Sequence, residues 1–514
     1  MQIVCPAIDE KGSEISMQTK KVNIVTTTLP KVHGGRTKSL LQRTKLFNEQ
    51  GIDVKLVTTN YHHNYNEIYT DYYEKSKVLE NTTFCNIYDF YKNKYSENVT
   101  KIYWQVLLEK EIGCINNYIK VKRSKTKGSN GYVYYYSDGI PKASIFYENG
   151  KALRFALYEE FQFEPIKIFY INDYECVHLI NTQNQHKQLL KKDFLTDDGQ
   201  VYATKFFDQE KSTKKINLHT SEKVVFEFNS EKEFFTYYYS EIFNEEDIVI
   251  TDARALDGSL LNTKVKRRIF QLHSSHLGNP LNNLSKAKGS FRGLLERNLT
   301  DHDKIITLTA KQRKDILRIY PKLDNNIEVI SHSTKPRVIK HKKIGKRLGF
   351  VGRLDPNKNL EDVLHAFAIF RKDYPEYILD VYGDGKNKKN LEQLVKSLNI
   401  EDSVVFHGNV DDVDKAYQEM DMLLVTSLFE GFALNVLEAI SNGTQVVTYD
   451  INYGPTDIID ENSGFIVKER TPEALAGAMI EAVKVPKEQA NLIERSRKFS
   501  EEIFLKRWKK VLEG

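Results

Sequence analysis

The sequence predicts an α/β protein with two parallel α/β domains and an antiparallel β insertion in the first of them. Three observations support this prediction. A strand, a glycine-containing loop, a helix and a second strand succeed one another within residues 21–60. Strands alternate with helices again over residues 222–334 and 347–485, which is the pattern of parallel α/β domains. Over residues 61–221, alternating strand-like runs and tight turns replace that pattern.

The first domain opens with a β-rich run, Lys21–Thr28, that leads into a loop containing Gly34 and Gly35. A helical pattern follows and stops at Gly51, after which Asp53–Thr59 predicts the next strand. This β–loop–α–β order, with glycine at the first turn, is typical of a Rossmann-like domain. Residues 222–334 are expected to complete it, with strands at Asp247–Thr251, Arg268–Leu272, Lys304–Leu308 and Ile327–Ile330.

Residues 61–221 are predicted to form the insertion. The run Gly131–Tyr136 leads into Asp138-Gly139, and Ala143–Tyr147 leads into Asn149-Gly150. Asp-Gly and Asn-Gly between alternating runs are strong signals for β-hairpins. We therefore expect an antiparallel sheet that interrupts the first domain.

A basic, proline-containing stretch, residues 335–346, predicts a linker to the second α/β domain, residues 347–485. The alternation of apolar runs and helical patterns predicts the following strands and helices. Strands are expected at Arg347–Val351, Ile378–Tyr382, Val404–His407, Met422–Thr426, Gln445–Tyr449 and Gly464–Val467, and helices at Leu360–Lys372, Lys389–Leu398, Ala433–Ser441 and Pro472–Val483. The last helical run, within residues 486–514, is long enough to cross back onto the first domain.

Composition narrows the class of protein. The net charge of +5 results from 75 basic and 70 acidic side chains among 514 residues, so a nucleic-acid binder with one dominant basic field is not expected. The four cysteines are scattered without a Cys-x-x-Cys pair, which suits a reducing compartment. Residues 1–20 form a polar extension without the apolar core of a signal peptide, and no apolar run is long enough to span a membrane. We expect a soluble, cytoplasmic protein.

One group of candidate site residues follows the first strand of the second domain. The segment Val351-Gly-Arg-Leu-Asp-Pro-Asn-Lys358 lies between a strand and a helix, at the edge of an open α/β sheet where ligands bind. Arg353 and Lys358 offer a planar donor fork and a point charge, which together suit a diphosphate. The alternative is an ordinary solvated basic loop.

A second group begins about seventy residues later, in Ser427–Ala439. Glu430 lies in a loop, and a helix starts near Ala433, so that Ala433, Leu434 and Asn435 form a turn with backbone N–H groups free to bind phosphate. Glu438 lies within the helix and can accept hydrogen bonds from a ribose diol. Both acids could be solvated surface residues, but Glu438 borders an apolar face, where a carboxylate needs a partner.

These motifs resemble those of the retaining GT-B glycosyltransferases of family 4. The resemblance rests on Gly352-Arg353 with Lys358, Tyr382-Gly-Asp-Gly385, Phe406-His-Gly408, Glu430-Gly-Phe with Glu438, and the Gly34-Gly35 loop. It covers residues 21–60 and 245–500. The β-rich insertion and Ile451–Asp457 further resemble the bacterial wall teichoic acid glycosyltransferases, which act on poly(ribitol-phosphate) or poly(glycerol-phosphate). The resemblance implies the GT-B fold, with two Rossmann-like domains.

The resemblance also implies roles for individual residues. Arg353 and Lys358 would hold the donor diphosphate, Glu430 would contact the transferred sugar, and Glu438 would bind the ribose. Gly34 and Gly35 would let the backbone approach the phosphates and the acceptor. His273, within Gln271-Leu-His-Ser-Ser-His276, falls where the family has an active-site histidine, although His276 competes for that role. The sequence departs from many relatives in Asn435, where they have proline, and in Ala433, where they have glycine or serine.

The implied reaction is retaining, so the departing phosphate oxygen can take the acceptor proton without an enzyme base. No Asp-x-Asp motif occurs at a plausible donor loop, and we expect a metal-independent transferase with no cofactor. Its donor would be UDP-N-acetylglucosamine or UDP-glucose, and its acceptor the hydroxyls of a polyol-phosphate polymer. We also expect a homo-oligomer, either a dimer or a trimer, held together by the insertion. The insertion is expected to bind the acceptor as well, and the protein to associate peripherally with the inner membrane face.

Three alternatives remain open at this point. The first is O-glycosylation of serine-rich or Ser-Asp repeat proteins, because enzymes that modify them share the same build. The second is a non-catalytic GT-B-like partner subunit, although such subunits typically lose the basic pair or the glutamates that are retained here. The third is a nucleotide-sugar epimerase of GT-B architecture, to which the motif spacing is less well suited.

Overall fold

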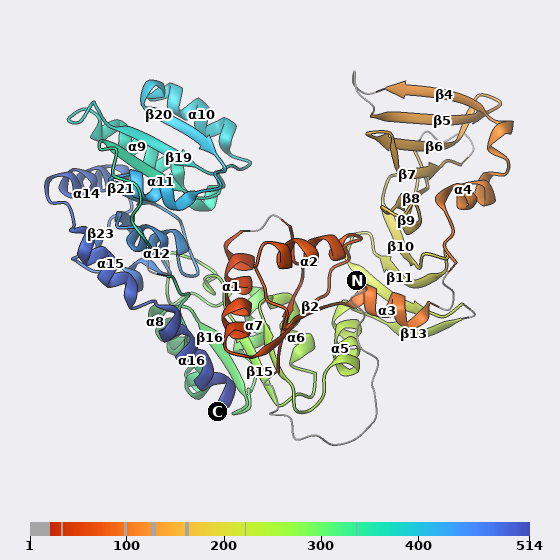
Figure 1. Cartoon of the computed structure of the whole chain (residues 1–514), viewed down its shortest axis with the longest axis horizontal. Helices are drawn as coiled ribbons and strands as arrows, with labels where there is room; N and C mark the ends of the chain where they lie inside the picture. The colour runs from red at the N-terminus through yellow and green to blue at the C-terminus, as the bar shows by residue number, and fades with distance from the viewer. Residues whose placement is uncertain are drawn as a thin grey trace. The chain divides into compact units, whose positions relative to one another are not determined.

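The computed structural model describes residues 21–31, 34–96, 100–124, 130–159, 164–221, 223–335 and 337–514. The expected N-terminal extension, residues 1–20, lies outside the described residues. The described chain divides into two compact units (Figure 1). The first unit holds the residues up to 31 together with 53–245 and 258–265, and the second holds 34–52, 246–257 and 266–514.

The first unit begins with parallel strands of a Rossmann-like sheet. Strand β1 (Lys21–Thr26) pairs with β2 (Asp53–Thr58), and β2 pairs with β3 (Thr82–Asn86). Helices α2 (Tyr65–Glu74) and α3 (Ile87–Tyr95) belong to this α/β layer. Its α/β pattern therefore continues to residue 95, beyond the expected start of the insertion at residue 61. The strand-like signal was misleading because tyrosines at helical spacing in α2 are buried, and one of them, Tyr69, stacks on Phe84.

An antiparallel sheet follows, as the sequence predicted. Its strands lie in the order β13 to β4, each paired with its sequence neighbours, and they span residues 119–228 rather than 61–221. The predicted hairpin turns are present, because Asp138-Gly139 and Asn149-Gly150 all have positive φ. The strands are β4 (Ile119–Ser124), β5 (Gly131–Ser137), β6 (Ile140–Glu148), β7 (Lys151–Leu157), β8 (Lys167–Ile171), β9 (Val177–Gln183), β10 (Leu189–Leu195), β11 (Val201–Phe207), β12 (Thr213–His219) and β13 (Val224–Phe228), with helices α4 (Trp104–Ile112) and α5 (Glu231–Ile242) beside them.

The second unit contains helix α1 (Gly35–Glu49) and a run of parallel strands, in which β14 pairs with β15, β15 with β16, and β16 with β17. Most residues of β14, β15 and β16 are buried. The bounds of the strands are β14 (Ile248–Thr251), β15 (Arg267–Gln271), β16 (Asp303–Thr307) and β17 (Ile327–Val329), and helices α7 (Gly289–Leu295) and α8 (Ala310–Ile319) lie between them in the chain. Helix α6 (Asp257–Leu260) belongs to the first unit except for Asp257.

A six-stranded parallel sheet forms the rest of the second unit, in the order β20-β19-β18-β21-β22-β23. This is the strand order of a doubly wound Rossmann fold, whose direction of winding reverses between β18 and β21. The strands are β18 (Arg347–Val351), β19 (Ile378–Tyr382), β20 (Val404–Gly408), β21 (Met422–Val425), β22 (Gln445–Tyr449) and β23 (Gly464–Val467), and the helices are α9 (Leu360–Phe370), α10 (Lys388–Ser397), α11 (Val413–Glu419), α12 (Leu434–Ser441), α13 (Pro455–Ile458) and α14 (Pro472–Lys484).

The chain ends in two helices where the sequence predicted one run. Helix α15 spans Gln489–Arg497, and α16 spans Glu501–Glu513 after Ser500, whose hydroxyl accepts from Ile503 N and caps α16. Helix α16 packs on α1, with the rings of Phe47 and Trp508 5.6 Å apart. The C-terminal helix therefore joins the two α/β layers of the second unit.

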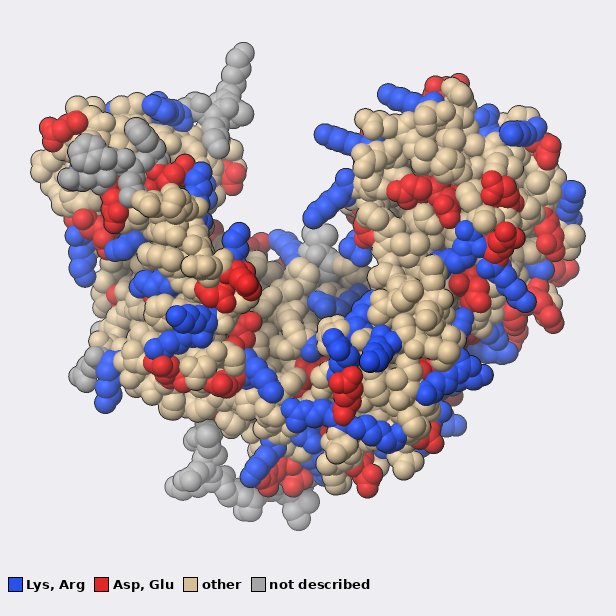
Figure 2. Space-filling view, turned by 180° about the vertical axis from the view of Figure 1, so that it is seen from behind, with Lys and Arg blue, Asp and Glu red and all other residues tan. Residues whose placement is uncertain are grey.

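The surface agrees with the balanced composition. Figure 2 shows basic and acidic side chains interspersed over the face that it presents. Cys85, Cys114 and Cys176 are free thiols. Among the described residues, none of the helices has both the length and the apolarity that crossing a membrane requires.

Candidate functional site

The predicted donor-binding residues lie at the point where the six-stranded sheet reverses its winding. The loop after β18 carries Gly352 to Lys358, and the loop after β21 carries Glu430. Gly383 and Gly385 allow the neighbouring loop to approach very closely, because a Cβ at Gly383 would lie 1.9 Å from the Gly352 carbonyl oxygen. Ligands of open α/β sheets bind at this reversal point.

Lys358 and Glu430 form an ion pair at this position. Lys358 Nζ donates to Glu430 Oε1 across 2.6 Å, and the two side chains are only 17% and 15% exposed. The carbonyls of Lys358 and Asn359 both accept from the Thr426 hydroxyl, which ties the Lys358 loop to the end of β21. Two of the predicted catalytic residues are therefore in direct contact.

Arg353 lies apart from that pair. Its side chain is 77% exposed, and its Nη2 atom lies 3.1 Å from Asp355 Oδ2 on the same loop. A long, exposed guanidinium with one acidic neighbour is free to turn toward an incoming anion, because little packing holds it. The structure places Arg353 on the predicted loop without bringing it onto Lys358.

Helix α12 begins immediately after the Glu430 loop. Ala433 precedes it in the left-handed conformation, with φ of 63°, and supplies no side-chain cap. Asn435 Nδ2 donates to the Val351 carbonyl across 3.1 Å and so fixes the first turn of α12 to the end of β18. Proline, which the family resemblance implies at this position, would lack this donor. The first-turn N–H groups of α12 and the helix dipole favour a bound anion.

The glycine loop of α1 approaches the same turn. A Cβ on Gly35 would lie 3.3 Å from Leu434 Cδ1, so the beginnings of α1 and α12 are in contact, and Gly34 is the N-cap of α1. The predicted donor-binding residues Gly34, Gly35, Ala433, Leu434 and Asn435 are thus brought together, although the chain separates the two groups by nearly four hundred residues.

Glu438 lies one turn into α12 and is held from two sides. Its Oε1 atom accepts from Lys38 Nζ at 2.6 Å, and its Oε2 atom accepts from the Tyr417 hydroxyl at 3.0 Å. Burial, and then the Glu438 charge, raise the pKa of Tyr417 well above its ordinary value of 10, so the phenol stays protonated and donates. The carboxylate is 18% exposed and keeps lone pairs for a further donor such as a ribose hydroxyl.

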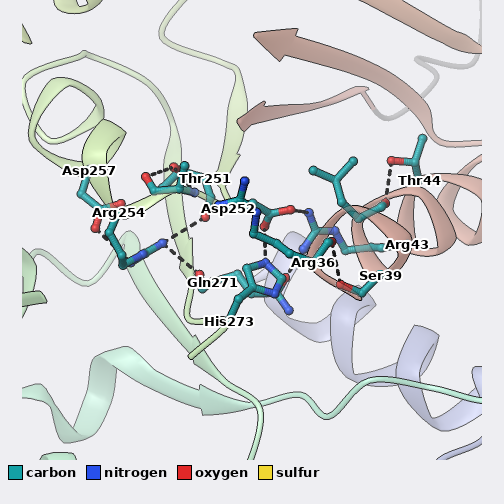
Figure 3. Close-up of polar contacts among 12 residues, drawn as sticks. Arg36, Ser39, Arg43, Thr44, Thr251, Asp252, Arg254, Asp257, Gln271 and His273 are labelled. Atoms are coloured by element: carbon teal, nitrogen blue, oxygen red, sulfur yellow. Dashed lines mark hydrogen bonds and ion pairs between the residues drawn. The ribbon is translucent and has the colours of Figure 1, made fainter. Parts of the chain in front are cut away.

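His273 belongs to a buried polar cluster (Figure 3). Its Nε2 atom lies 3.2 Å from Asp252 Oδ1, and Arg43 Nη2 pairs with Asp252 Oδ2 at 2.8 Å. Arg43 also donates to the Gln271 side chain. Burial lowers the pKa of His273, against the opposing charge of Asp252. Burial alone would raise the pKa of Asp252, but Arg43 and His273 outweigh it and hold the pKa below the ordinary range. His273 is therefore a neutral ring oriented by a carboxylate.

Arg254 and Asp257 extend the polar cluster beyond Asp252. Arg254 donates to the carbonyls of Gln271 and Thr251 and lies 2.9 Å from Asp257 Oδ2 (Figure 3). Burial raises the pKa of Asp257 to about 7, against the opposing charge of Arg254. These contacts fix the ends of β14 and β15, from which Asp252 and His273 project.

The two candidate histidines have different surroundings. Gly431 lies against the His273 backbone, since a Cβ on Gly431 would be 2.1 Å from the His273 carbonyl oxygen, and this places His273 beside the Glu430 loop. His276 is fully buried and stacks on the Tyr453 ring at 5.9 Å. Burial lowers the pKa of His276 to about 4. The geometry favours His273 as the ring near the donor site.

Sequence reasoning missed several members of this site. Lys38 and Arg43 lie in α1, Tyr417 lies in α11 and Asp252 follows β14, and each resembles an ordinary helix or strand residue. Lys38 alone carried a usable signal, because it follows the Gly34-Gly35 loop by one helical turn. Within the part of the chain that the structure describes, no three His, Cys, Asp or Glu side chains are grouped so that they would hold a metal ion.

Comparisons with known proteins bear on the fold and on the class of protein. Residues 332–499 match the family model described as Glycosyl transferases group 1. The poly(ribitol-phosphate) alpha-N-acetylglucosaminyltransferase of Staphylococcus aureus (strain COL) is 24% identical, over 95% of this chain and 99% of its own. The poly(glycerol-phosphate) alpha-glucosyltransferase of Bacillus subtilis (strain 168) is also 24% identical, over 92% of this chain and 71% of its own.

A solved structure has the same fold. The crystal structure of an S. aureus TarM mutant in complex with Fondaparinux, alpha-GlcNAc-glycerol and UDP aligns with a TM-score of 0.83 and 22% identity, over 96% of this chain and 100% of that one. The predicted GT-B fold with its antiparallel insertion is therefore confirmed. This chain is a glycosyltransferase, and its residues 332–499 form a group 1 glycosyltransferase domain.

Proposed function

We propose that this protein transfers N-acetylglucosamine or glucose from a UDP-sugar to hydroxyls of a polyol-phosphate polymer, the backbone of wall teichoic acid, with retention of configuration. The observation that carries the proposal is the ion pair of Lys358 and Glu430 beside the start of α12, the helix that holds Glu438 one turn further on. The chain is also similar to two teichoic acid glycosyltransferases over more than nine-tenths of its length.

The donor diphosphate is assigned to the space at the beginning of α12. There the first-turn N–H groups, Lys358 and the exposed guanidinium of Arg353 supply positive charge as the nucleotide leaves. Glu438 accepts from the ribose diol while Tyr417 and Lys38 hold its carboxylate in place. Lys358 already contacts Glu430, so the same lysine links the diphosphate to the residue that is assigned to the sugar.

The sugar-transfer step needs no basic side chain in this scheme. The bond from the anomeric carbon to the diphosphate oxygen breaks, the acceptor oxygen bonds to the same face, and its proton passes to the departing phosphate oxygen. His273, kept neutral by burial and oriented by Asp252, lies beside the Glu430 loop and is assigned to the sugar hydroxyls. Because fixed cations stabilise the leaving diphosphate, we propose that transfer proceeds without a metal ion or cofactor.

We propose a cytoplasmic location, peripheral association with the inner membrane face, and a homo-oligomer held by the insertion. Size-exclusion chromatography with light scattering tests the oligomer. A monomer at micromolar concentration would contradict it.

The activity is tested by measuring UDP release from a panel of UDP-sugars in EDTA, with and without acceptors. Release that rises with poly(ribitol-phosphate) or poly(glycerol-phosphate) supports the proposal and identifies the sugar. Stimulation by a serine-aspartate peptide alone would reassign the acceptor to protein. Lys358→Ala should reduce transfer at least about a hundredfold, as expected for a group that stabilises a leaving charge. Near-normal activity in that variant would overturn the site assignment.

A further inference from the structure

The two faces of the antiparallel sheet in the first unit differ. Strand β5 turns Val133 and Tyr135 into a buried core with Trp104 and Leu108 of α4, which lies on that side of the sheet (Figure 1). The alternate residues of β5, which include Tyr132 and Tyr134, are only half-buried on the opposite face. Successive strand side chains point to opposite faces, so these tyrosines share a face that α4 does not cover.

A row of cations and aromatic rings crosses that opposite face. The register places one residue from each of five neighbouring strands directly opposite the next. Directly opposite residues lie on the same side of a sheet and contact each other. The row consists of Arg123, Tyr132, Phe146, Arg154 and Tyr170, which with Tyr134 we call the tyrosine face.

The guanidinium groups cover the rings of this face. Arg123 lies over the Tyr134 ring at 5.5 Å, and Arg154 lies over the Phe146 ring at 5.2 Å. Arg154 Nη2 also donates to the Tyr132 hydroxyl at 3.0 Å. Stacking holds each guanidinium in a defined plane while leaving N–H donors along its edge. The face therefore presents fixed arginine donors beside phenol hydroxyls.

Positive charge continues on the same side of the sheet. Asn181 Nδ2 donates to the Tyr170 hydroxyl at 3.3 Å, and Asn181 is directly opposite Lys192, which is directly opposite Lys205. Like charges that face each other across a ladder are unfavourable. Lys205 is paired with Glu231, and no ion pair of Lys192 is seen in the described part of the chain. Lys192 thus adds a cation that an anionic ligand would stabilise.

We propose that the tyrosine face is a binding site for the polyol-phosphate chain, separate from the donor site: Arg123 and Arg154 bind its phosphodiesters, and the hydroxyls of Tyr132 and Tyr170 bind its polyol hydroxyls. The ligand class rests on the proposed function. Arginine forks match phosphate geometry, and phenols both donate to and accept from hydroxyls. A second site on one chain raises the local concentration of a repetitive acceptor, so it strengthens the binding of long polymers more than that of single repeats.

Two other occupants are less well suited to this face. Single-stranded nucleic acid binds by stacking bases on open aromatic rings, whereas the rings of Phe146 and Tyr134 are covered by guanidinium groups. A second copy that met this face with its own would bring arginines against arginines, and like charges that face each other are unfavourable.

The test compares two double variants that each remove two positive charges. The first variant, Arg123→Gln with Arg154→Gln, changes the tyrosine face. The control is Lys122→Gln with Lys211→Gln, because Lys122 is the neighbour of Arg123 on β4 and belongs to the other face of the sheet, and Lys211 lies in a turn. Binding of poly(ribitol-phosphate) and poly(glycerol-phosphate) is measured without donor. The arginine variant should bind the polymers about tenfold more weakly, and the control should bind normally.

Transfer kinetics give a second measurement. The arginine variant should show a raised KM for polymer and unchanged transfer to glycerol phosphate or ribitol phosphate. Tyr132→Phe with Tyr170→Phe removes only two hydroxyls and should also weaken polymer binding. Because this change is conservative, it tests the face even where the arginine variant fails to fold. Because binding is measured without donor, a native protein that binds polymer but transfers no sugar would refute the proposed function alone.

Three results would overturn the proposal. The first is that the arginine variant binds the polymer as tightly as the native protein does. The second is that the variant loses binding to an oligouridine but not to the polymer. The third is that light scattering shows a changed oligomer mass for the variant while its polymer binding is unchanged.

Discussion

Lys38 donates to Glu438 Oε1 across 2.6 Å and joins α1 to α12, although the two residues are 400 positions apart in the chain. Each lies about one turn from the beginning of its helix, and the two helix beginnings touch through Gly35 and Leu434. The glycine loop of the first α/β layer is thereby attached to the carboxylate that we assign to the donor ribose.

This contact leads to a prediction about donor binding. Lys38→Ala should raise the KM for the UDP-sugar about three- to tenfold with little change in kcat, because a half-exposed ion pair contributes about 1 kcal/mol. Removing the lysine leaves the Glu438 charge uncompensated close to an anionic donor. Steady-state kinetics check this, and Lys31→Ala, which breaks the exposed pair with Glu67, is the control. A fall in kcat at constant KM would contradict the assignment.

Close backbone packing at Gly431 gives a second prediction. Gly431→Ala would place a methyl group 2.1 Å from the His273 carbonyl oxygen, so the Glu430 loop must move away from His273. We expect kcat to fall at least about tenfold, since displacements of about 1 Å at a catalytic group have such effects. Gly477→Ala in α14 is the matched control, because nothing lies within 4 Å of its added Cβ. Equal activities of the two variants would show that the contact is unimportant.

The buried pair of Arg43 and Asp252 predicts a large effect on stability. The two side chains are 2% and 0% exposed, so Asp252→Ala leaves an uncompensated buried guanidinium and should lower the free energy of unfolding by about 3–5 kcal/mol. Chemical denaturation of the purified protein measures this. Glu494→Ala, which breaks the exposed pair with Arg497, should change stability by less than about 1 kcal/mol. Similar losses in both variants would contradict the buried-pair argument.

Two buried histidines predict how stability depends on pH. Burial lowers the pKa of His332 to about 3 and that of His276 to about 4. Between pH 6.5 and about 4 the unfolded chain therefore binds protons at these positions that the folded chain does not, and stability falls as the pH falls, by about 1.4 kcal/mol per pH unit for each histidine.

Replacing His276 isolates its share. His276→Phe keeps a ring that can stack on Tyr453 and should reduce the slope of stability against pH by the contribution of one histidine. Denaturation curves between pH 4.5 and 6.5 measure the slope. Replacing the exposed His186 with alanine should leave it unchanged. An unaltered slope for His276→Phe would mean that this ring is protonated in the folded protein.

Local sequence determined the strands, most of the helices and the loops of the second domain, although α11 and α13 were not predicted. Short apolar runs, glycine stops and helical spacing predicted every strand of the six-stranded sheet, and the loops carrying Lys358 and Glu430 followed from their place after a strand. Periodicity was misleading where tyrosines are frequent, because an aromatic residue suits a buried helix face and a strand equally well. Helix α2 was missed for that reason, and the break at Ser500 was missed because flanking residues favoured one continuous helix.

Only the tertiary structure decided which distant side chains share the site. The parallel order of β18 and β21 brings Lys358 onto Glu430, and the packing of α1 on α12 brings Lys38 onto Glu438. Asp252, Arg43 and Tyr417 carry no local signal, because their importance arises from burial. A charged or hydroxyl group removed from water needs a partner, and that partner is supplied by another element of the fold. Sequence thus determined the elements and the reactive loops, while the tertiary structure determined the pairs that hold those loops in place.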